Sequence, residues 1–340
     1  MAKWNRKGGR AFFLSGLICI SSLLGLLQPA SAVLEVESLI PVGHTIGIKL
    51  FADGVVVIGL AEVETSQGVS TPGVDCGLQV GDVIEQANGA EVESSEQFAE
   101  LLQCGGKVRL LVSRDGETLT LAAEPVLGED GAYRLGAWIR DSMAGIGTVT
   151  FYDPATGAFG ALGHGITDTD TGLLMPLGDG SVMDATVKAV KPGSAGEPGE
   201  LRGNFDLSRD MGRLYANTDR GVFGVMDGSG FADSEAVPVA GPGEVHAGPA
   251  IILANVSGDR VEEYDIEISR VLGTEDVQNL LVQVTDQRLI QQTGGIVQGM
   301  SGSPILQDGK LVGAVTHVMI NEPTKGYGIL IENMLAEAGR

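Results

Sequence analysis

Near its C-terminal end the sequence reads Gly299-Met300-Ser301-Gly302-Ser303-Pro304-Ile305, with a serine set between glycines shortly before the apolar run Leu311–His317. A serine on such a turn presents its hydroxyl, and glycine lets neighbouring backbone N–H groups point at an oxyanion that develops there. The expected donors are the N–H groups of Gly299 and Ser301. A plain Gly/Ser/Pro turn between two strands is the alternative, and a base elsewhere in the chain would separate the two interpretations.

A nucleophilic serine needs a base whose pKa lies near the working pH, and histidine is the usual partner. The chain has four histidines. His164 lies between glycines after the expected strand Ala158–Leu162, and the order His164 then Ser301 is that of chymotrypsin-like proteases. The other three histidines fit less well. His44 lies in the N-terminal unit, His246 follows a Gly/Pro-rich loop, and His317 lies on an apolar strand, where we expect a core residue.

The turn around Ser301 resembles the nucleophile turn of chymotrypsin-like serine proteases, in the form Gly-x-Ser-Gly-x-Pro. Ser303 lies where most of these enzymes have glycine, so it is a second candidate nucleophile behind Ser301. An aspartate that orients the histidine usually lies between the two along the chain. Chain order leaves this residue open among five aspartates: Asp168, Asp170, Asp184, Asp206 and Asp286.

Composition and charge limit the class of protein. The 340 residues are 43% hydrophobic but only 5% aromatic, with 51 glycines, which favours many short Val, Ile and Leu strands in two domains. A net charge of −22 repels phosphate backbones, so nucleic acid is not an expected partner. The sequence has neither a Cys/His cluster with metal-ligand spacing nor a phosphate-binding loop, and we expect no metal and no cofactor.

The N-terminal segment, residues 1–32, predicts export. The apolar run Ala11–Leu27 follows a basic stretch and precedes the small residues Ala30-Ser31-Ala32, which together form an export signal. The length of the run, about 17 residues, leaves a cleaved signal and a retained membrane anchor both open. Outside the cytoplasm a disulfide between Cys76 and Cys104 is permitted, but the sequence does not decide between a disulfide and two separate thiols.

Residues 33–127 resemble a PDZ domain. The resemblance rests on Gly77-Leu78-Gln79-Val80-Gly81-Asp82-Val83-Ile84, then the tight turn Asn88-Gly89 and a helix that Ser94 and Gln97 cap. Upstream, Thr45-Ile46-Gly47-Ile48 is similar to the loop in which PDZ domains bind a peptide carboxylate. An ordinary bulge in a strand is the alternative for Gly47.

The whole chain resembles one family, the stage IV sporulation protein B peptidases of endospore-forming bacteria. The order of export signal, PDZ domain and protease supports this resemblance. The segments that carry it are Gly163-His164-Gly165-Ile166-Thr167-Asp168, Val284-Thr285-Asp286, residues 293–305, Gly313-Ala314-Val315-Thr316-His317-Val318 and Gly326-Tyr327-Gly328.

The resemblance implies a mainly β fold in which the PDZ domain is followed by a chymotrypsin-like double β-barrel over residues 128–340. It assigns the catalytic triad to His164, Asp286 and Ser301, with the N–H groups of Gly299 and Ser301 as the oxyanion hole. It also implies that the PDZ domain binds a peptide, either a C-terminus or an internal segment.

The function that the resemblance implies is a serine endopeptidase exported to the space between mother cell and forespore. Members of the family cleave themselves and then a membrane-bound regulatory protein, which starts intramembrane proteolysis and activates a late sigma factor. Two alternatives are a non-catalytic exported PDZ adaptor and a general extracytoplasmic quality-control protease.

Overall fold

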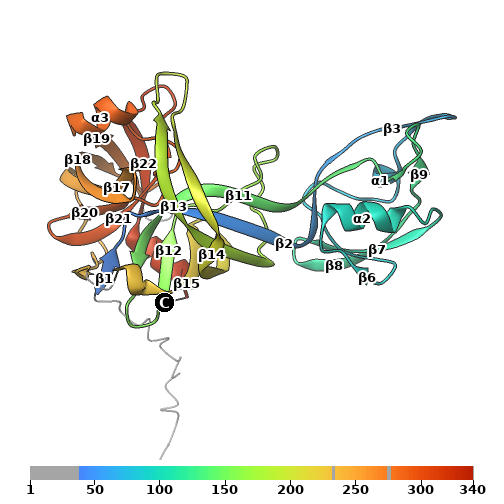
Figure 1. Ribbon diagram of the computed structural model, residues 1–340, viewed down its shortest axis with the longest axis horizontal. Coiled ribbons are helices and arrows are strands. Elements are labelled where there is room, and N and C mark those ends of the chain that lie inside the picture. Colours follow the sequence, from blue (N-terminus) through green and yellow to red (C-terminus); the bar gives the residue numbers. More distant parts are fainter. Residues whose placement is uncertain (1–37, 232–233, 274–276, 340) are drawn as a thin grey trace, which may run out of the picture. The chain divides into compact units, whose positions relative to one another are not determined.

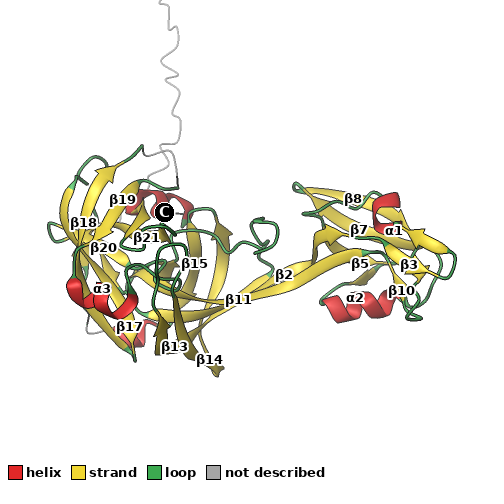
Figure 2. Ribbon diagram, turned by 90° about the horizontal axis from the view of Figure 1, so that it is seen from above, coloured by secondary structure: helices red, strands yellow, loops and turns green. Residues whose placement is uncertain are grey.

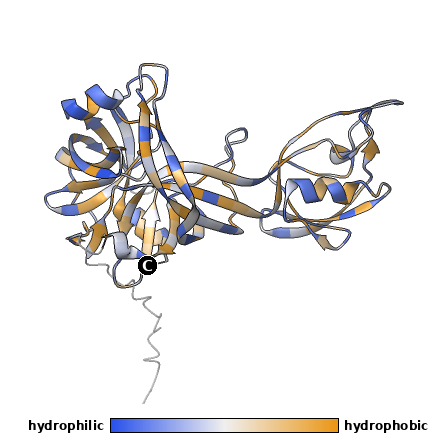
Figure 3. Ribbon diagram, viewed as in Figure 1, coloured by the Kyte–Doolittle hydropathy of each residue, from blue (hydrophilic) through white to orange (hydrophobic). Residues whose placement is uncertain are grey.

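The computed structural model describes residues 38–231, 234–273 and 277–339, without the side chains of residues 207–209. The predicted export segment, residues 1–32, lies outside these ranges. All elements below belong to one unit, Val36–Arg340. The chain is mainly β, as the sequence predicts, and apolar and polar residues alternate along many of its strands (Figure 3). None of the helices in the described ranges has the length and apolar character needed to span a bilayer.

The first barrel contains the predicted histidine and is closed by a pairing between strands far apart in the sequence (Figure 1). β2 (Thr45–Leu60) pairs with β11 (Ala137–Tyr152) on one edge and with β13 (Asp179–Lys191) on the other, so the sheet returns on itself. β1 (Ser38–Pro41) pairs with β11 and with β16 (Val237–Pro238). The strands of the barrel are β2 (Thr45–Leu60), β11 (Ala137–Tyr152), β12 (Ala158–Ala161), β13 (Asp179–Lys191), β14 (Glu200–Thr218) and β15 (Gly221–Met226).

The second barrel contains the predicted nucleophile and has the largest apolar core, around Ile252, Ile266 and Val282. Two short helices belong to the same part of the chain: α3 (Gln287–Thr293) follows β19 (Leu280–Val284), and α4 (Ile331–Glu337) follows β22 (Lys325–Leu330). The predicted double β-barrel is therefore confirmed. The strands of the second barrel are β17 (Gly248–Ser257), β18 (Arg260–Val271), β19 (Leu280–Val284), β20 (Pro304–Gln307), β21 (Lys310–Val318) and β22 (Lys325–Leu330).

The PDZ domain packs α2 (Ser95–Leu102) against strands around a core that includes Ile84, Phe98 and Leu110. As predicted, Ser94 caps this helix by accepting a hydrogen bond from the Gln97 N–H, at 3.1 Å. The other elements are β3 (Val63–Thr65), β4 (Gly68–Ser70), α1 (Pro72–Asp75), β5 (Val83–Ala87), β6 (Ala90–Glu91), β7 (Val108–Arg114), β8 (Glu117–Ala123), β9 (Val126–Leu127) and β10 (Tyr133–Arg134).

β2 and β11 each serve both the PDZ domain and the first barrel, and they lie side by side (Figure 2). The first part of β2, Ile46–Phe51, pairs with β13 of the barrel, whereas Val55 and Val56 pair with β5 of the PDZ domain. The start of β11 pairs with the end of β2. Strand pairing thus assigns residues 38–51 to the first barrel, although the sequence places them within the PDZ range 33–127.

An ion pair with a buried carboxylate stabilises the PDZ domain and supports a first prediction. Asp82 is fully buried; it accepts hydrogen bonds from Arg114 Nε at 2.6 Å and from the Gln79 N–H at 2.8 Å. Asp82→Ala removes the buried carboxylate that accepts these hydrogen bonds, so we expect a loss of about 2 kcal/mol in the free energy of unfolding. Urea denaturation followed by circular dichroism measures it. Arg213→Ala, which removes an exposed ion pair with Asp179, should leave the free energy of unfolding nearly unchanged. Equal effects of the two substitutions would contradict this account.

Candidate active site

Strand β11 holds the turn that carries Ser301. Thr148 Oγ1 donates a hydrogen bond to the Gly299 carbonyl at 2.8 Å, and the Thr148 N–H donates to the Ser301 carbonyl at 2.9 Å. Thr150 Oγ1 donates to the Gly302 carbonyl, also at 2.8 Å. Gly302 has φ +95°, and a Cβ there would lie 2.0 Å from the Thr148 carbonyl oxygen, so only glycine fits this turn. Three successive contacts therefore fix the turn to the first barrel.

The predicted oxyanion donors are available. The turn's carbonyl groups accept hydrogen bonds from β11, whereas the N–H groups of Gly299 and Ser301 have no acceptor within the described ranges. An N–H group without an intramolecular partner is free to bind a developing oxyanion. The geometry is consistent with the predicted role of these two amides.

Ser301, His164 and Gly299 line one cleft of about 530 Å³. The cleft receives residues from both barrels, including β11 of the first and β21 of the second. Apolar side chains form most of its remaining wall: Ile48, Met143, Ile146, Ile296, Val297, Val318 and Ile320. A peptide with apolar side chains near the cleaved bond fits such a wall.

A tight turn at the end of β12 positions His164. Leu162, a non-glycine residue, has φ +68°, and Gly163 has φ +69°, which is unusual backbone of the kind that collects at functional sites. His164 Nδ1 lies 2.9 Å from the Gly165 carbonyl oxygen. Because a carbonyl only accepts, Nδ1 carries the proton and Nε2 keeps the lone pair that a general base needs. A backbone carbonyl thus orients the imidazole in this structure.

Burial lowers the pKa of His164 from its ordinary value of 6.5 to about 4, and the neighbouring His317 contributes to the decrease. The rings of His164 and His317 lie with their centroids 4.7 Å apart. His164 is therefore neutral, and able to act as a base, at every pH above about 5.

His317 occupies the cleft because of a bulge in β21. Val315 pairs with Gly328 and His317 with Tyr327, so Thr316 is an extra residue on its strand. The bulge turns the exposed His317 side chain towards the cleft and leaves the Thr316 carbonyl to accept a hydrogen bond from Ser301 Oγ at 2.6 Å. The expectation that His317 is a core residue is wrong for this reason. A bulge of one residue has no clear signal in a single sequence.

The structure brings together two of the three predicted triad residues. Asp286 lies at the N-cap of α3, where its carboxylate accepts hydrogen bonds from the Arg288 N–H at 2.8 Å and Arg288 Nη2 at 2.7 Å. The hydrogen bonds from Arg288 are the main cause that lowers the pKa of Asp286. Within the described ranges Asp286 neither lines the cleft nor bonds to His164.

The remaining candidates have other surroundings. Ser303 is fully buried, so a substrate cannot reach its hydroxyl. Asp168 and Asp170 both pair with Arg140. The other four lie outside the cleft: His44 pairs with Asp184, His246 pairs with Asp308, and Asp206 is exposed on β14. Cys76 and Cys104 are free thiols.

The predicted carboxylate-binding loop does not match the structure. Thr45, Ile46, Gly47 and Ile48 form the start of β2, and β11 and β13 pair with the two edges of this segment. A strand with both edges paired has no free edge to receive a peptide. The buried Thr45 side chain donates instead to the Asn255 carbonyl at 3.2 Å.

A serine on a fixed turn, a neutral histidine in the same cleft and two free amides, between two β-barrels, are the parts of a serine peptidase. The comparison with protein families agrees: SpoIVB peptidase S55 matches residues 131–335, and a PDZ domain matches residues 66–115. The chain belongs to the SpoIVB peptidase S55 family.

Single proteins show more distant likeness. LL2128 of Lactococcus lactis, named provisionally as a zinc metalloprotease, is 36% identical over 99 residues, which are 28% of this chain and 22% of LL2128. This chain thus spans about a fifth of that relative. The Rv3671c protease of M. tuberculosis in its active form is 14% identical over 59% of this chain and 75% of that chain, with a TM-score of 0.31. The PDZ domain of the SdrC-like protein of Listeria monocytogenes is 20% identical over 26% of this chain and 87% of that chain, with a TM-score of 0.21.

The low pKa of His164 predicts how reactivity depends on pH. The rate at which a fluorophosphonate labels Ser301 should stay level from pH 8 to about 5.5 and fall with a midpoint near pH 4, because His164 takes up its proton only there. His317→Gln should raise this midpoint, whereas His246→Gln, in a separate ion pair, should not. Circular dichroism at each pH checks that the protein is folded. A midpoint near 6.5 in the unmodified protein would contradict the buried, neutral His164.

The hydrogen bond from Thr148 to Gly299 predicts a second effect on reactivity. Thr148→Val keeps the shape but removes the donor, so the turn is held less firmly and labelling of Ser301 should slow by about tenfold. Thr45→Val is the matched control, since Thr45 is a buried threonine on the neighbouring strand whose hydroxyl bonds to a carbonyl of the second barrel. An equal loss of labelling in both variants would show that general destabilisation, and not the turn, is responsible.

Proposed function

We propose that this chain is an exported regulatory serine endopeptidase of endospore formation. It cleaves itself and then a membrane-bound regulatory protein, which starts intramembrane proteolysis and the activation of a late sigma factor. Membership of the SpoIVB peptidase S55 family supports this role, and so does the N-terminal signal pattern of residues 1–32. The single observation that carries the catalytic part is that Ser301 and His164 line one cleft with the free amides of Gly299 and Ser301.

The proposed reaction begins with rotation of the Ser301 side chain, because its hydroxyl donates to the Thr316 carbonyl in this structure. Once the hydroxyl faces His164, Nε2 takes its proton as Oγ attacks the peptide carbonyl. The amides of Gly299 and Ser301 bind the oxyanion. His164 then protonates the leaving amine, an acyl-enzyme remains on Ser301, and water releases it.

The resting arrangement of Ser301 and His164 supports a peptidase that cleaves few substrates. Ser301 Oγ is bonded to a backbone carbonyl, and His164 faces another imidazole, so the reactive pair is not yet joined. An exported protease that must not digest its surroundings benefits from such a state. A general quality-control protease would instead degrade unfolded protein broadly.

Fluorophosphonate labelling of the full chain, with the labelled residue located by mass spectrometry, tests the catalytic part. We expect labelling at Ser301 that both Ser301→Ala and His164→Ala abolish, and self-cleavage that the same two substitutions prevent. Denatured casein should remain uncut. Labelling absent from the unmodified protein would favour the PDZ adaptor, and rapid digestion of casein would favour the quality-control protease.

Asp286→Asn tests the third residue of the triad, which rests on family resemblance. Asparagine caps helices about as well as aspartate. Labelling retained within about threefold would therefore assign Asp286 to the cap of α3, whereas loss to the level of His164→Ala would assign it to the orientation of His164. Arg288→Ala, which frees the carboxylate, serves as the companion variant.

A further inference from the structure

Three neighbouring strands of the first barrel bring Asn217 close to His164. Ala161, at the end of β12, pairs with Val222 of β15, and Val222 pairs with Asn217 near the end of β14. Asn217 therefore lies two strands away from the residue that stands three positions before His164. The loop that leaves β12 spans this distance, because Ile166 forms hydrogen bonds with the Asn217 side chain.

The side-chain amide of Asn217 forms three hydrogen bonds with this loop. Oδ1 accepts from the Ile166 N–H at 2.8 Å, and Nδ2 donates to the carbonyls of Ile166 at 3.0 Å and Met175 at 2.8 Å. Exchanging the two ends of the amide would place Oδ1 against two carbonyl oxygens, so these contacts determine its orientation. Asn217 thus holds together the two ends of the segment 166–175.

The peptide unit between Gly165 and Ile166 connects Asn217 with His164. Its N–H donates to Asn217 Oδ1, and its carbonyl accepts the hydrogen bond from His164 Nδ1 at 2.9 Å. The N–H and C=O of a planar trans peptide point in opposite directions. Because Asn217 fixes the N–H, it also fixes the direction of the carbonyl that orients the imidazole. Hydrogen bonds that share one peptide unit also strengthen each other by polarisation.

The close approach of this peptide unit to β14 requires glycine at position 165. A Cβ there would lie 2.7 Å from the Thr218 carbonyl oxygen and would collide with the Leu174 side chain. The glycine that follows His164 in the sequence thus allows the peptide unit to reach Asn217.

The third residue of a serine peptidase triad holds the imidazole in the tautomer whose Nε2 can accept a proton. Asp286 does not form this contact in the structure, and the Gly165 carbonyl does. A carbonyl can perform this task only while its peptide plane is held in place. Asn217 supplies that constraint from outside the cleft, since it is not among the residues that line it.

We propose that Asn217 is a positioning residue for His164. Through the Gly165–Ile166 peptide unit it keeps the imidazole as the Nδ1–H tautomer and leaves the Nε2 lone pair for the proton of Ser301. The part of this proposal that concerns Ser301 rests on the peptidase function proposed above. Without the Asn217 amide the peptide unit can rotate, Nδ1–H loses its acceptor, and the two tautomers of His164 mix.

NMR of the full chain labelled with ¹⁵N in its histidine rings tests the proposal at pH 7, with His164→Gln to assign the signals. We expect His164 to be the Nδ1–H tautomer alone in the unmodified protein. Asn217→Leu, which is similar in size but forms none of the hydrogen bonds, should show both tautomers. The Nε2–H tautomer in the unmodified protein, or an unchanged tautomer in folded Asn217→Leu, would overturn the proposal.

Hydrogen exchange provides a test that needs no variant. The Ile166 N–H is bonded to Asn217 Oδ1, so in the unmodified protein its exchange should be at least a hundredfold slower than in an unstructured peptide. Exchange at the rate of an unstructured peptide would show that Asn217 does not hold this peptide unit, and would overturn the proposal.

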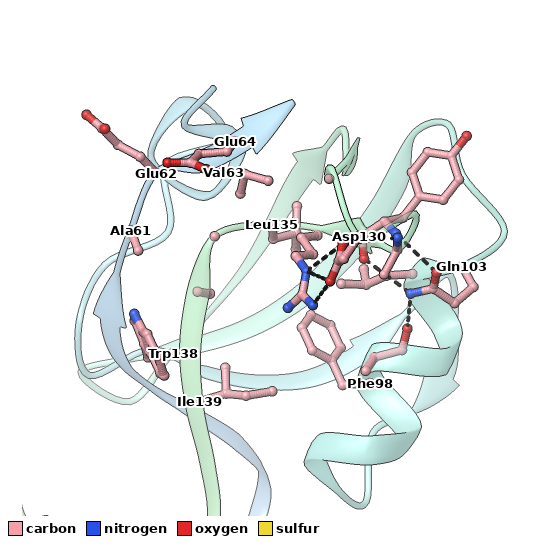
Figure 4. A pocket seen from close by; sticks show the side chains of 18 of the residues that line it. Ala61, Glu62, Val63, Glu64, Phe98, Gln103, Asp130, Leu135, Trp138 and Ile139 are labelled. Carbon is pink, nitrogen blue, oxygen red and sulfur yellow. Dashed lines mark hydrogen bonds and ion pairs between the residues drawn. The ribbon is translucent and has the colours of Figure 1, made fainter. Parts of the chain in front are cut away.

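Gln103 offers a matched control, because its side-chain amide forms the same kinds of hydrogen bond in the PDZ domain (Figure 4). Oε1 accepts from the Tyr133 N–H at 3.1 Å, and Nε2 donates to the carbonyls of Tyr133 at 3.2 Å and Ala99 at 2.9 Å. Gln103→Met removes these bonds from a residue that does not line the catalytic cleft. It should leave the tautomer of His164 unchanged and the labelling rate of Ser301 within twofold.

Fluorophosphonate labelling measures the consequence for Ser301. In Asn217→Leu the maximal labelling rate should fall at least tenfold. The reagent concentration that gives half of this rate should change less than threefold, because Asn217 does not line the cleft. Equal losses in Asn217→Leu and Gln103→Met would indicate general destabilisation and overturn the proposal. The expected tautomers without labelling of any form, the unmodified protein included, would count against the peptidase function alone, since the tautomer does not depend on Ser301 chemistry.

Discussion

The two hydrogen bonds that Thr148 donates are the contacts on which the catalytic arrangement depends. They join β11 of the first barrel to the Ser301 turn of the second, in which the N–H groups of Gly299 and Ser301 have no acceptor within the described ranges. The close approach of β11 to the turn also requires glycine at position 302, because a Cβ there would collide with the Thr148 carbonyl oxygen. Fixing donors before the reaction is the main way in which a protein stabilises an oxyanion, because no reorganisation is then needed.

The same structure holds the site in a resting state. Burial keeps His164 neutral but holds its pKa at about 4, below the range of a strong general base. The His164 ring also lies against His317, and the Ser301 hydroxyl bonds to the Thr316 carbonyl. The bulge at Thr316 creates both features at once, because it supplies the carbonyl and turns His317 into the cleft. The proposed reaction therefore starts with rotation of the Ser301 side chain away from the Thr316 carbonyl.

Patterns local in sequence predicted much of this protein. Glycine-flanked serine and histidine, together with the PDZ stretch from Gly77 to Gly89, carried the family resemblance, and this resemblance implied the double barrel. The same patterns singled out Ser301 and His164, which the structure brings into one cleft. Long-range pairing was missed: Thr45–Ile48 has the composition of a PDZ loop, but β11 and β13 take both of its edges. His317 was misjudged because a bulge shifts alternation by one residue. Asp286 followed from resemblance, and no pattern in the chain reveals that Arg288 binds its carboxylate.

The structure of the protein after reaction with a fluorophosphonate tests the central claim most directly. The account predicts a phosphorus atom bonded to Ser301 Oγ, a phosphonyl oxygen within hydrogen-bond distance of the Gly299 and Ser301 N–H groups, and the Thr148 hydrogen bonds unchanged. It also predicts that the Ser301 side chain has left the Thr316 carbonyl. A phosphonyl oxygen that points away from both amides, or a label on a residue other than Ser301, would contradict it.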